Sequence, residues 1–273
     1  MNIAQKAWWW LSGDGASYSS DANTVFTNIG GTLSTPVKNA IATFVDAEVA
    51  AGRWSQLDVF QIWGTALGSE SQGLKNWKSS TDFHATNPNG HTATAQGYDF
   101  AGSGTSGILT GYNPTTGTNW TATNAMIGIY VRTNDSTADQ KNLLGIGTGT
   151  VGWTQRTVAS RLDFMGAVIN AVGTAQKTVY ANGWEQGLWT AEEEIVAAGP
   201  QYTQRIRKNG VDLGLGSGAV PVELNNSFYI GGLNNSTTPY DGVITGFFAG
   251  AKFASVSNFY TNYLTLLTSL GIV

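Results

Sequence analysis

The chain of 273 residues has no cysteine, carries a formal net charge of −4 at pH 7 and is 41% hydrophobic, so it can bury a core of its own. The absence of cysteine excludes disulfide frameworks, thiol nucleophiles and zinc sites that need thiolates. The slightly acidic balance, without any run of basic residues, argues against a nucleic-acid partner.

Charged residues make up only 12% of the sequence, about half of the usual ~25%. The surface must therefore be covered mainly by uncharged polar residues, which suits contact with other protein copies. We expect no membrane insertion, because the apolar stretch Val243 to Ala251 is far shorter than the roughly 20 residues of a bilayer span. The apolar run Trp8-Trp9-Trp10-Leu11 is also too short for a secretory signal.

The N-terminal segment, residues 1–33, shows neither a helical nor a strand period and predicts an irregular arm. After Ser34, Pro36 favours a first helical turn, and apolar residues at helical spacing predict an amphipathic helix over residues 35–52. From Trp54 to Trp77 the apolar residues show no clean period, so we expect short helical or irregular structure there.

Beyond Trp77 the sequence changes to short apolar or alternating runs separated by turn-forming residues, which is typical of antiparallel β sandwiches. This pattern predicts a mainly β fold, a two-sheet antiparallel jelly-roll sandwich that forms a single domain over residues 34–273. The candidate strands are Gly97 to Phe100, Ser106 to Tyr112, Ala125 to Thr133, Asn142 to Thr148, Arg161 to Ile169, Gln186 to Ala191, Tyr202 to Lys208, Val211 to Leu215, Ser227 to Ile230 and Gly242 to Phe253.

The clearest local signal is Asn209-Gly210, which stands between two alternating runs. These two residue types favour the positive φ angles of a type I′ turn, so we expect a tight hairpin. A second amphipathic helix is predicted over residues 257–270, with Ser257 as its N-cap and Gly271 after its end.

Several segments resemble a known family. Gly97-Tyr98-Asp99-Phe100-Ala101-Gly102 and the following Ile108-Leu109-Thr110-Gly111-Tyr112-Asn113-Pro114 are similar to a motif of bacteriophage structural proteins with a concanavalin A-like (LamG-like) jelly-roll domain. The strand around Gly246-Phe247-Phe248-Ala249-Gly250 and the closing helix around Tyr260-Thr261-Asn262-Tyr263-Leu264 resemble the same proteins. The likeness covers residues 35 to 273 and leaves the arm unmatched.

This resemblance implies a non-enzymatic phage virion protein, a capsid decoration, fibre or tail component that is assembled in the host cytoplasm. Its partners would be other virion proteins and copies of itself in a homo-oligomer. Three consecutive tryptophan rings on an irregular arm cannot all face one core, and aromatic residues are enriched at interfaces. The candidate assembly interface is therefore Trp8, Trp9, Trp10 and Leu11.

We expect no catalytic residues. Hydrolases with this fold carry two carboxylates on one strand, in a pattern close to Glu-x-Asp-x-x-Glu, which the sequence lacks. The cluster Glu192-Glu193-Glu194 predicts a solvated edge or loop, and Asp163 a surface residue or a partner of Arg161. The two histidines, His84 and His91, lie in one turn-rich loop, which disfavours a catalytic triad and a metal site.

No cofactor or metal is expected, although calcium stays an open alternative. Asn134, Asp135 and Asp139 could supply oxygen ligands to it, as could Asp241 near Asn235.

An alternative function is carbohydrate binding, as a lectin-like adhesin that recognises a host-surface glycan. Such a site needs exposed aromatic rings that stack on sugars, and Trp153, Trp184, Trp189 and Tyr240 lie in or beside predicted loops. A less favoured alternative is a glycoside hydrolase, which would need two carboxylates about 5 to 10 Å apart in a groove.

Overall fold

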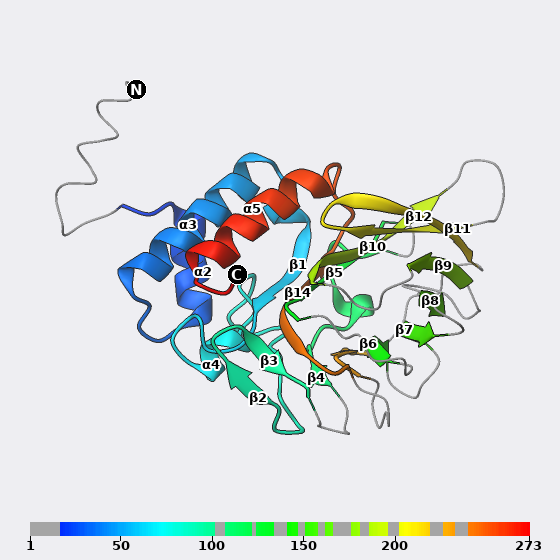
Figure 1. Ribbon diagram of the computed structural model, residues 1–273. Coiled ribbons are helices and arrows are strands. Elements are labelled where there is room, and N and C mark those ends of the chain that lie inside the picture. The colour runs from blue at the N-terminus through cyan, green and yellow to red at the C-terminus, as the bar shows by residue number, and fades with distance from the viewer. Residues whose placement is uncertain are drawn as a thin grey trace.

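The computed structural model of the protein describes residues 17–101, 107–121, 124–133, 141–146, 151–157, 162–165, 176–180, 186–195, 202–218, 226–232 and 240–273. In these parts of the chain, two antiparallel sheets and a layer of helices make up the fold (Figure 1). The prediction of a mainly β, two-sheet antiparallel sandwich is confirmed. No helix among the described residues has the length and apolar character needed to cross a bilayer.

The larger sheet has eight strands in the spatial order β12-β11-β10-β5-β14-β3-β2, with β1 paired to β14. One edge of β14 pairs with β5 along its length, while its other edge pairs with β1 and, nearer its start, with β3. The strands are β1 (Leu57–Ile62), β2 (Thr92–Thr94), β3 (Gly97–Asp99), β5 (Met126–Val131), β10 (Gly187–Ile195), β11 (Tyr202–Lys208), β12 (Val211–Gly218) and β14 (Val243–Gly250).

The smaller sheet has six strands in the order β4-β13-β6-β7-β8-β9. They are β4 (Ile108–Leu109), β6 (Lys141–Ile146), β7 (Val151–Thr157), β8 (Leu162–Met165), β9 (Gln176–Tyr180) and β13 (Phe228–Ile230). All ten predicted strands overlap strands of the structure, whereas β1, β2, β7 and β9 were not predicted.

The helices gather on one side of the larger sheet, with α3 and α5 next to each other (Figure 1). The long helices are α2 (Ser20–Ile29), α3 (Thr35–Ala50) and α5 (Val256–Ser269). The short ones are α4 (Glu70–Gly73) and the 3₁₀ turns η1 (Trp54–Gln56) and η2 (Pro114–Thr116). The two predicted helices, 35–52 and 257–270, therefore differ from α3 and α5 by at most two residues at either end.

Two hydrophobic cores lie on the two faces of the larger sheet. Along β5, Ile127 and Ile129 face the core between the sheets, whereas Met126 and Tyr130 face the core beneath the helices. Successive side chains of a strand point to opposite faces, so one strand serves both cores. Every residue of β5 is buried in consequence.

The arm predicted over residues 1–33 is wrong for its second half, since α2 occupies Ser20–Ile29. The Ser19 hydroxyl accepts the backbone N–H of Ala22 and caps the helix. Val25 and Ile29 are buried in the core beneath the helices. Ala22, Val25 and Ile29 recur at helical spacing, a local pattern that the prediction of an arm overlooked, and α2 docks against α3.

The irregular structure predicted between Trp54 and Trp77 is also wrong where β1 lies. All six residues of β1 are buried, including the polar Asp58 and Gln61. A strand covered on both faces loses the alternation of apolar and polar residues, so the period that identifies a strand is missing.

The tight hairpin at Asn209-Gly210 is confirmed. Both residues have positive φ, 54° and 77°, and they join Lys208 of β11 to Val211 of β12. A Cβ atom on Gly210 would lie 2.6 Å from Cα of Ser257 in α5, so close approach to the helix also requires glycine.

A buried carboxylate on β1 holds the segment that follows η2. Asp58 accepts hydrogen bonds from the backbone N–H groups of Thr118, Asn119 and Trp120 and from the Tyr112 hydroxyl. Hydrogen bonds to a charged acceptor are stronger than neutral ones. This one side chain therefore fixes an otherwise irregular stretch of chain against the larger sheet.

Replacing this carboxylate should destabilise the whole fold. In Asp58→Asn an amide N–H₂ would face N–H and O–H donors, and we expect the free energy of unfolding to fall by about 3 kcal/mol. Urea unfolding followed by tryptophan fluorescence measures the change. Asp46→Asn is the matched control, because Asp46 is exposed and accepts a hydrogen bond from Ser19. Equal unfolding midpoints for the two variants would contradict the role given to Asp58.

Candidate functional site

Two of the predicted sugar-binding aromatic residues are core residues. Trp189 points from β10 into the core between the sheets and is fully buried, with Lys208 Nζ 5.6 Å from its ring centre. Tyr240 is also fully buried, and its hydroxyl donates to the carbonyl of Thr133. Neither ring offers a face to a sugar, so the structure contradicts their proposed role.

The other predicted site residues are not described. Trp8, Trp9, Trp10 and Leu11 lie outside the described residues, as does Trp184. Trp153 belongs to β7, but its side chain is outside the described part. The assembly interface and two of the sugar-binding positions therefore stay predictions.

The sequence predicted that Glu192 lies in a solvated edge or loop, and the structure contradicts this prediction. It lies within β10, is 2% exposed and accepts a hydrogen bond from Arg207 Nε at 2.9 Å. Burial raises the pKa of the Glu192 carboxyl, and the hydrogen bond from Arg207 opposes that effect. Each charged group thus has an opposite charge as its partner, on the face of the sheet that also carries Met126.

Both histidines are engaged in the protein framework. His84 Nδ1 accepts the backbone N–H of Asn76, and its Nε2 lies 2.9 Å from the carbonyl oxygen of Ser80. His91 is buried against Phe100, with ring centres 4.5 Å apart. Within the described ranges, no three His, Asp or Glu side chains form a metal-binding group.

The residues considered for calcium are mostly outside the described ranges. Asn134, Asp135, Asp139 and Asn235 are not described, and only Asp241 of that set is. The calcium alternative therefore stays untested.

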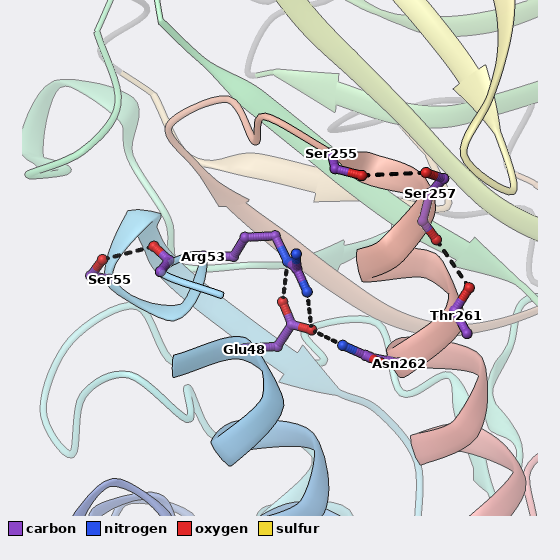
Figure 2. Close-up of polar contacts among 8 residues, drawn as sticks. Glu48, Arg53, Ser55, Ser255, Ser257, Thr261 and Asn262 are labelled. Atoms are coloured by element: carbon purple, nitrogen blue, oxygen red, sulfur yellow. Dashed lines mark hydrogen bonds and ion pairs between the residues drawn. The ribbon is translucent and has the colours of Figure 1, made fainter. Parts of the chain in front are cut away.

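Buried polar groups also join the helices. Glu48 of α3 is fully buried, and its carboxylate accepts from Arg53 Nε at 2.6 Å, Arg53 Nη2 at 2.9 Å and Asn262 Nδ2 at 2.7 Å. Figure 2 shows the three side chains meeting between α3 and α5. Because both carboxylate oxygens have donors, this group joins the two helices and leaves little capacity for a ligand.

The strongest candidate site is a half-open pocket of about 300 Å³ where α2, the end of α3, η1 and the loop after α4 meet. We call it the Trp54 pocket. Three of its lining residues are buried: Trp77 at 0%, Val25 at 1% and Trp54 at 7% exposure. The remaining lining residues are Asp21, Thr24, Val49, Ser55 and Lys78.

The ammonium group of Lys78 is held in place at this pocket. Nζ donates a 2.6 Å hydrogen bond to the carbonyl of Trp54 and lies 4.4 Å from the centre of the Trp54 ring. Burial lowers the pKa of Lys78 to about 8, although the negative charges of Asp21 and Asp58 oppose the shift. Lys78 is therefore a partly desolvated cation, fixed against an aromatic ring.

Trp77 packs beside the same pocket and carries a buried donor without a partner in the described part of the chain. Its backbone N–H donates to Phe60, and its carbonyl accepts from Asn28, so the main chain is fixed between β1 and α2. The buried indole N–H has no hydrogen-bond acceptor among the described residues. Leaving such a buried group unpaired costs free energy.

Asp21 supplies the opposite charge. It lies in the first turn of α2, where the helix dipole favours a carboxylate. Its charge acts on Lys78, yet in the described part of the chain the two side chains make no direct ion pair. An acceptor and a donor thus face one pocket without satisfying each other.

The lining residues of the Trp54 pocket were not predicted from the sequence. Asp21 lies within residues 1–33, which were predicted to be an irregular arm. Trp54 begins the segment that shows no clean period, and Lys78 directly follows that segment. Two local signals could have revealed α2: Ser19 and Asp21 favour a helix start, and Ala22, Val25 and Ile29 recur at helical spacing. Nothing local indicates that these segments converge.

A second surface feature lies on the outer side of α5. Thr261, Thr265 and Thr268 are exposed, and each hydroxyl donates to the carbonyl four residues earlier. No charged residue occurs between Phe253 and Val273. A shallow groove of about 260 Å³ separates this face from α3. The hydroxyls turn inward and the surface carries no charge.

No family model and no curated protein matches this sequence. Among solved structures, the Trypanosoma rangeli sialidase in complex with sialic acid is similar, with 15% identity and a TM-score of 0.50 over 85% of this chain and 38% of the sialidase. Domain 4 of AbnA, a GH43 extracellular arabinanase from Geobacillus stearothermophilus in complex with arabinotriose, is 15% identical with a TM-score of 0.45, over 75% of this chain and 98% of that domain. The binding domain of botulinum neurotoxin serotype D is 10% identical with a TM-score of 0.48, over 80% of this chain and 52% of that one. The sialidase likeness supports the β-sandwich fold and no more.

Proposed function

We propose that this protein is a non-catalytic carbohydrate-binding β-sandwich protein that binds a sugar in the Trp54 pocket. The observation that carries the proposal is the combination of Asp21 and Lys78 with the apolar side chains of Val25, Val49 and Trp54 around one pocket. Sugars are recognised by apolar aromatic surface for their C–H groups and by a few placed polar groups for their hydroxyls.

The size of the pocket supports a small ligand. Its volume of about 300 Å³ lies at the lower end of the roughly 300–1,000 Å³ of small-molecule sites, so a single sugar ring is the unit we expect it to hold. The β-sandwich fold is shared with a sialidase that was solved with sialic acid, so the fold occurs in a carbohydrate-active protein.

The acids of the described residues support a binding role over a hydrolytic one. Asp21 is the one carboxylate that lines the Trp54 pocket in the described part of the chain, whereas glycoside hydrolysis needs two. Asp58, Glu48 and Glu192 are buried and hydrogen-bonded to structural partners. Each of these three acids is thus committed to the fold.

Blocking the pocket should abolish sugar binding without disturbing the core. Val49 is 39% exposed on the pocket wall, so Val49→Trp would fill the space from outside. We expect a glycan array to show binding by the unmodified protein and titration calorimetry to show at least about tenfold weaker affinity for the variant.

Val211→Trp is the matched control, since Val211 is 65% exposed at the start of β12, outside the pocket. It should bind like the unmodified chain. An array without any bound glycan, or a Val49→Trp variant of undiminished affinity, would refute carbohydrate binding in this pocket.

A second proposal is an assembly role, as in the phage virion protein that the sequence resemblance implies. The observation that favours it is the uncharged face of α5, where Thr261, Thr265 and Thr268 turn their hydroxyls back to the helix. Such a face loses little solvation when another protein covers it. With charged residues at 12% of the chain, little repulsion opposes the contact.

A charge placed on this face should prevent association. We expect the unmodified protein to form oligomers and Thr265→Glu to run as a monomer, because an unpaired charge in an interface is costly. Size-exclusion chromatography with light scattering gives the mass of each. Thr27→Glu on α2 is the control, since Thr27 is exposed and its hydroxyl bonds back in the same way. If the unmodified chain is monomeric at every concentration, the assembly proposal fails.

A further inference from the structure

We propose that the Trp54 pocket recognises a neutral sugar by a vicinal diol, one hydroxyl of which donates to Asp21 while its neighbour accepts from Lys78 Nζ. This inference rests on the carbohydrate-binding function proposed above and names the class of sugar. It follows from the two opposite charges that line the same pocket without a direct ion pair.

Lys78 retains donor capacity for a ligand. An ammonium group carries three N–H donors, and in the described part of the chain one is used, by the carbonyl of Trp54 at 2.6 Å. The aromatic ring of Trp54 covers another side of the same group, at 4.4 Å from its centre. The cation is thus held in one place, which lowers the entropy cost of binding an oxygen atom there.

Asp21 retains acceptor capacity. The Ser19 hydroxyl accepts the backbone N–H of Ala22. The cap of α2 is therefore made by Ser19 and does not use the Asp21 carboxylate. Among the described residues, no hydrogen bond to Asp21 is present. A carboxylate with both oxygens available accepts hydroxyl donors strongly, because the bond is charge-assisted.

The pairing of the two charges selects a neutral ligand. A sugar carboxylate drawn to Lys78 would also meet the negative charge of Asp21, and an amino sugar drawn to Asp21 would meet Lys78. A hydroxyl is donor and acceptor at once, so adjacent hydroxyls satisfy an acid and a base together. A vicinal diol is the smallest group that offers both on neighbouring carbons.

The polar groups that the pocket offers match this ligand. Asp21 supplies an acceptor and Lys78 supplies donors, a set that a ring with adjacent hydroxyls matches and an apolar ligand does not.

The charge state of Lys78 gives this diol contact a pH dependence. Its pKa of about 8 means that the ammonium form dominates at pH 7 and the neutral amine at pH 9. The charge-assisted bond is present below this pKa and is lost as the pH rises through it. If the ammonium form alone binds, affinity should fall about tenfold from pH 7 to pH 9.

The experiment measures the affinity of the full chain for a set of methyl glycosides by titration calorimetry. The set contains neutral hexosides, the same sugars lacking one hydroxyl of the diol, and uronates. We expect neutral sugars to bind best and each deoxy sugar to bind about tenfold more weakly. We also expect Asp21→Asn and Lys78→Met to weaken binding about tenfold, with the pH dependence absent in Lys78→Met.

Lys75→Met is the matched control, because its side chain lies outside the pocket lining, and it should leave affinity unchanged. Stronger binding of uronates, or neutral binding that survives both pocket variants and loss of the diol, would overturn the diol assignment and leave carbohydrate binding in place. Absence of binding by every sugar would overturn the proposed function, and the diol assignment with it.

Discussion

The larger sheet is buried on both faces, and this constraint determines much of the rest of the fold. Its central strands carry one set of side chains into the core between the sheets and the other into the core beneath the helices. An antiparallel sheet can leave one face in water, but here Tyr130 and Phe248 place aromatic rings on the second face. That face must be covered, and α3 and α5 cover it. The Trp54 pocket lies at the margin of this helical cover, where α2, η1 and the loop after α4 converge.

The same burial governs the charges. A carboxylate removed from water must receive hydrogen bonds, and Asp58, Glu48 and Glu192 each receive them from partners distant in sequence or on a neighbouring strand. These acids join segments that apolar contact alone would leave loosely fixed. Asp21 and Lys78 differ from them, because they line a half-open pocket and, in the described part of the chain, make no direct ion pair.

The sequence predicted those elements whose local order of apolar, polar and turn-forming residues indicates which side chains are buried and where the chain turns. Strands that show a period or adjoin turn residues were found, and so was the turn at Asn209-Gly210, since its conformation depends on two residues. Strand β1 was missed because burial on both faces removes its period, and α2 because its short helical period was overlooked in a polar segment. Trp189 and Tyr240 were misplaced for a related reason: proximity to a predicted loop does not reveal which way a ring points. The pocket joins residues 21, 54 and 78, and no local pattern reports that convergence.

The contribution of α2 to the pocket couples ligand occupancy to the docking of the leading segment. Asp21, Thr24 and Val25 form one wall, and the rest of the pocket belongs to α3, η1 and the segment at Trp77. A ligand that needs both walls stabilises the docked helix by mass action, in proportion to the logarithm of its concentration above its dissociation constant. By reciprocity, any protein that pulled the leading helix away would release the ligand. Truncating the chain at residue 34, where the sequence alone would draw a boundary, would therefore abolish recognition even if the sandwich remained folded.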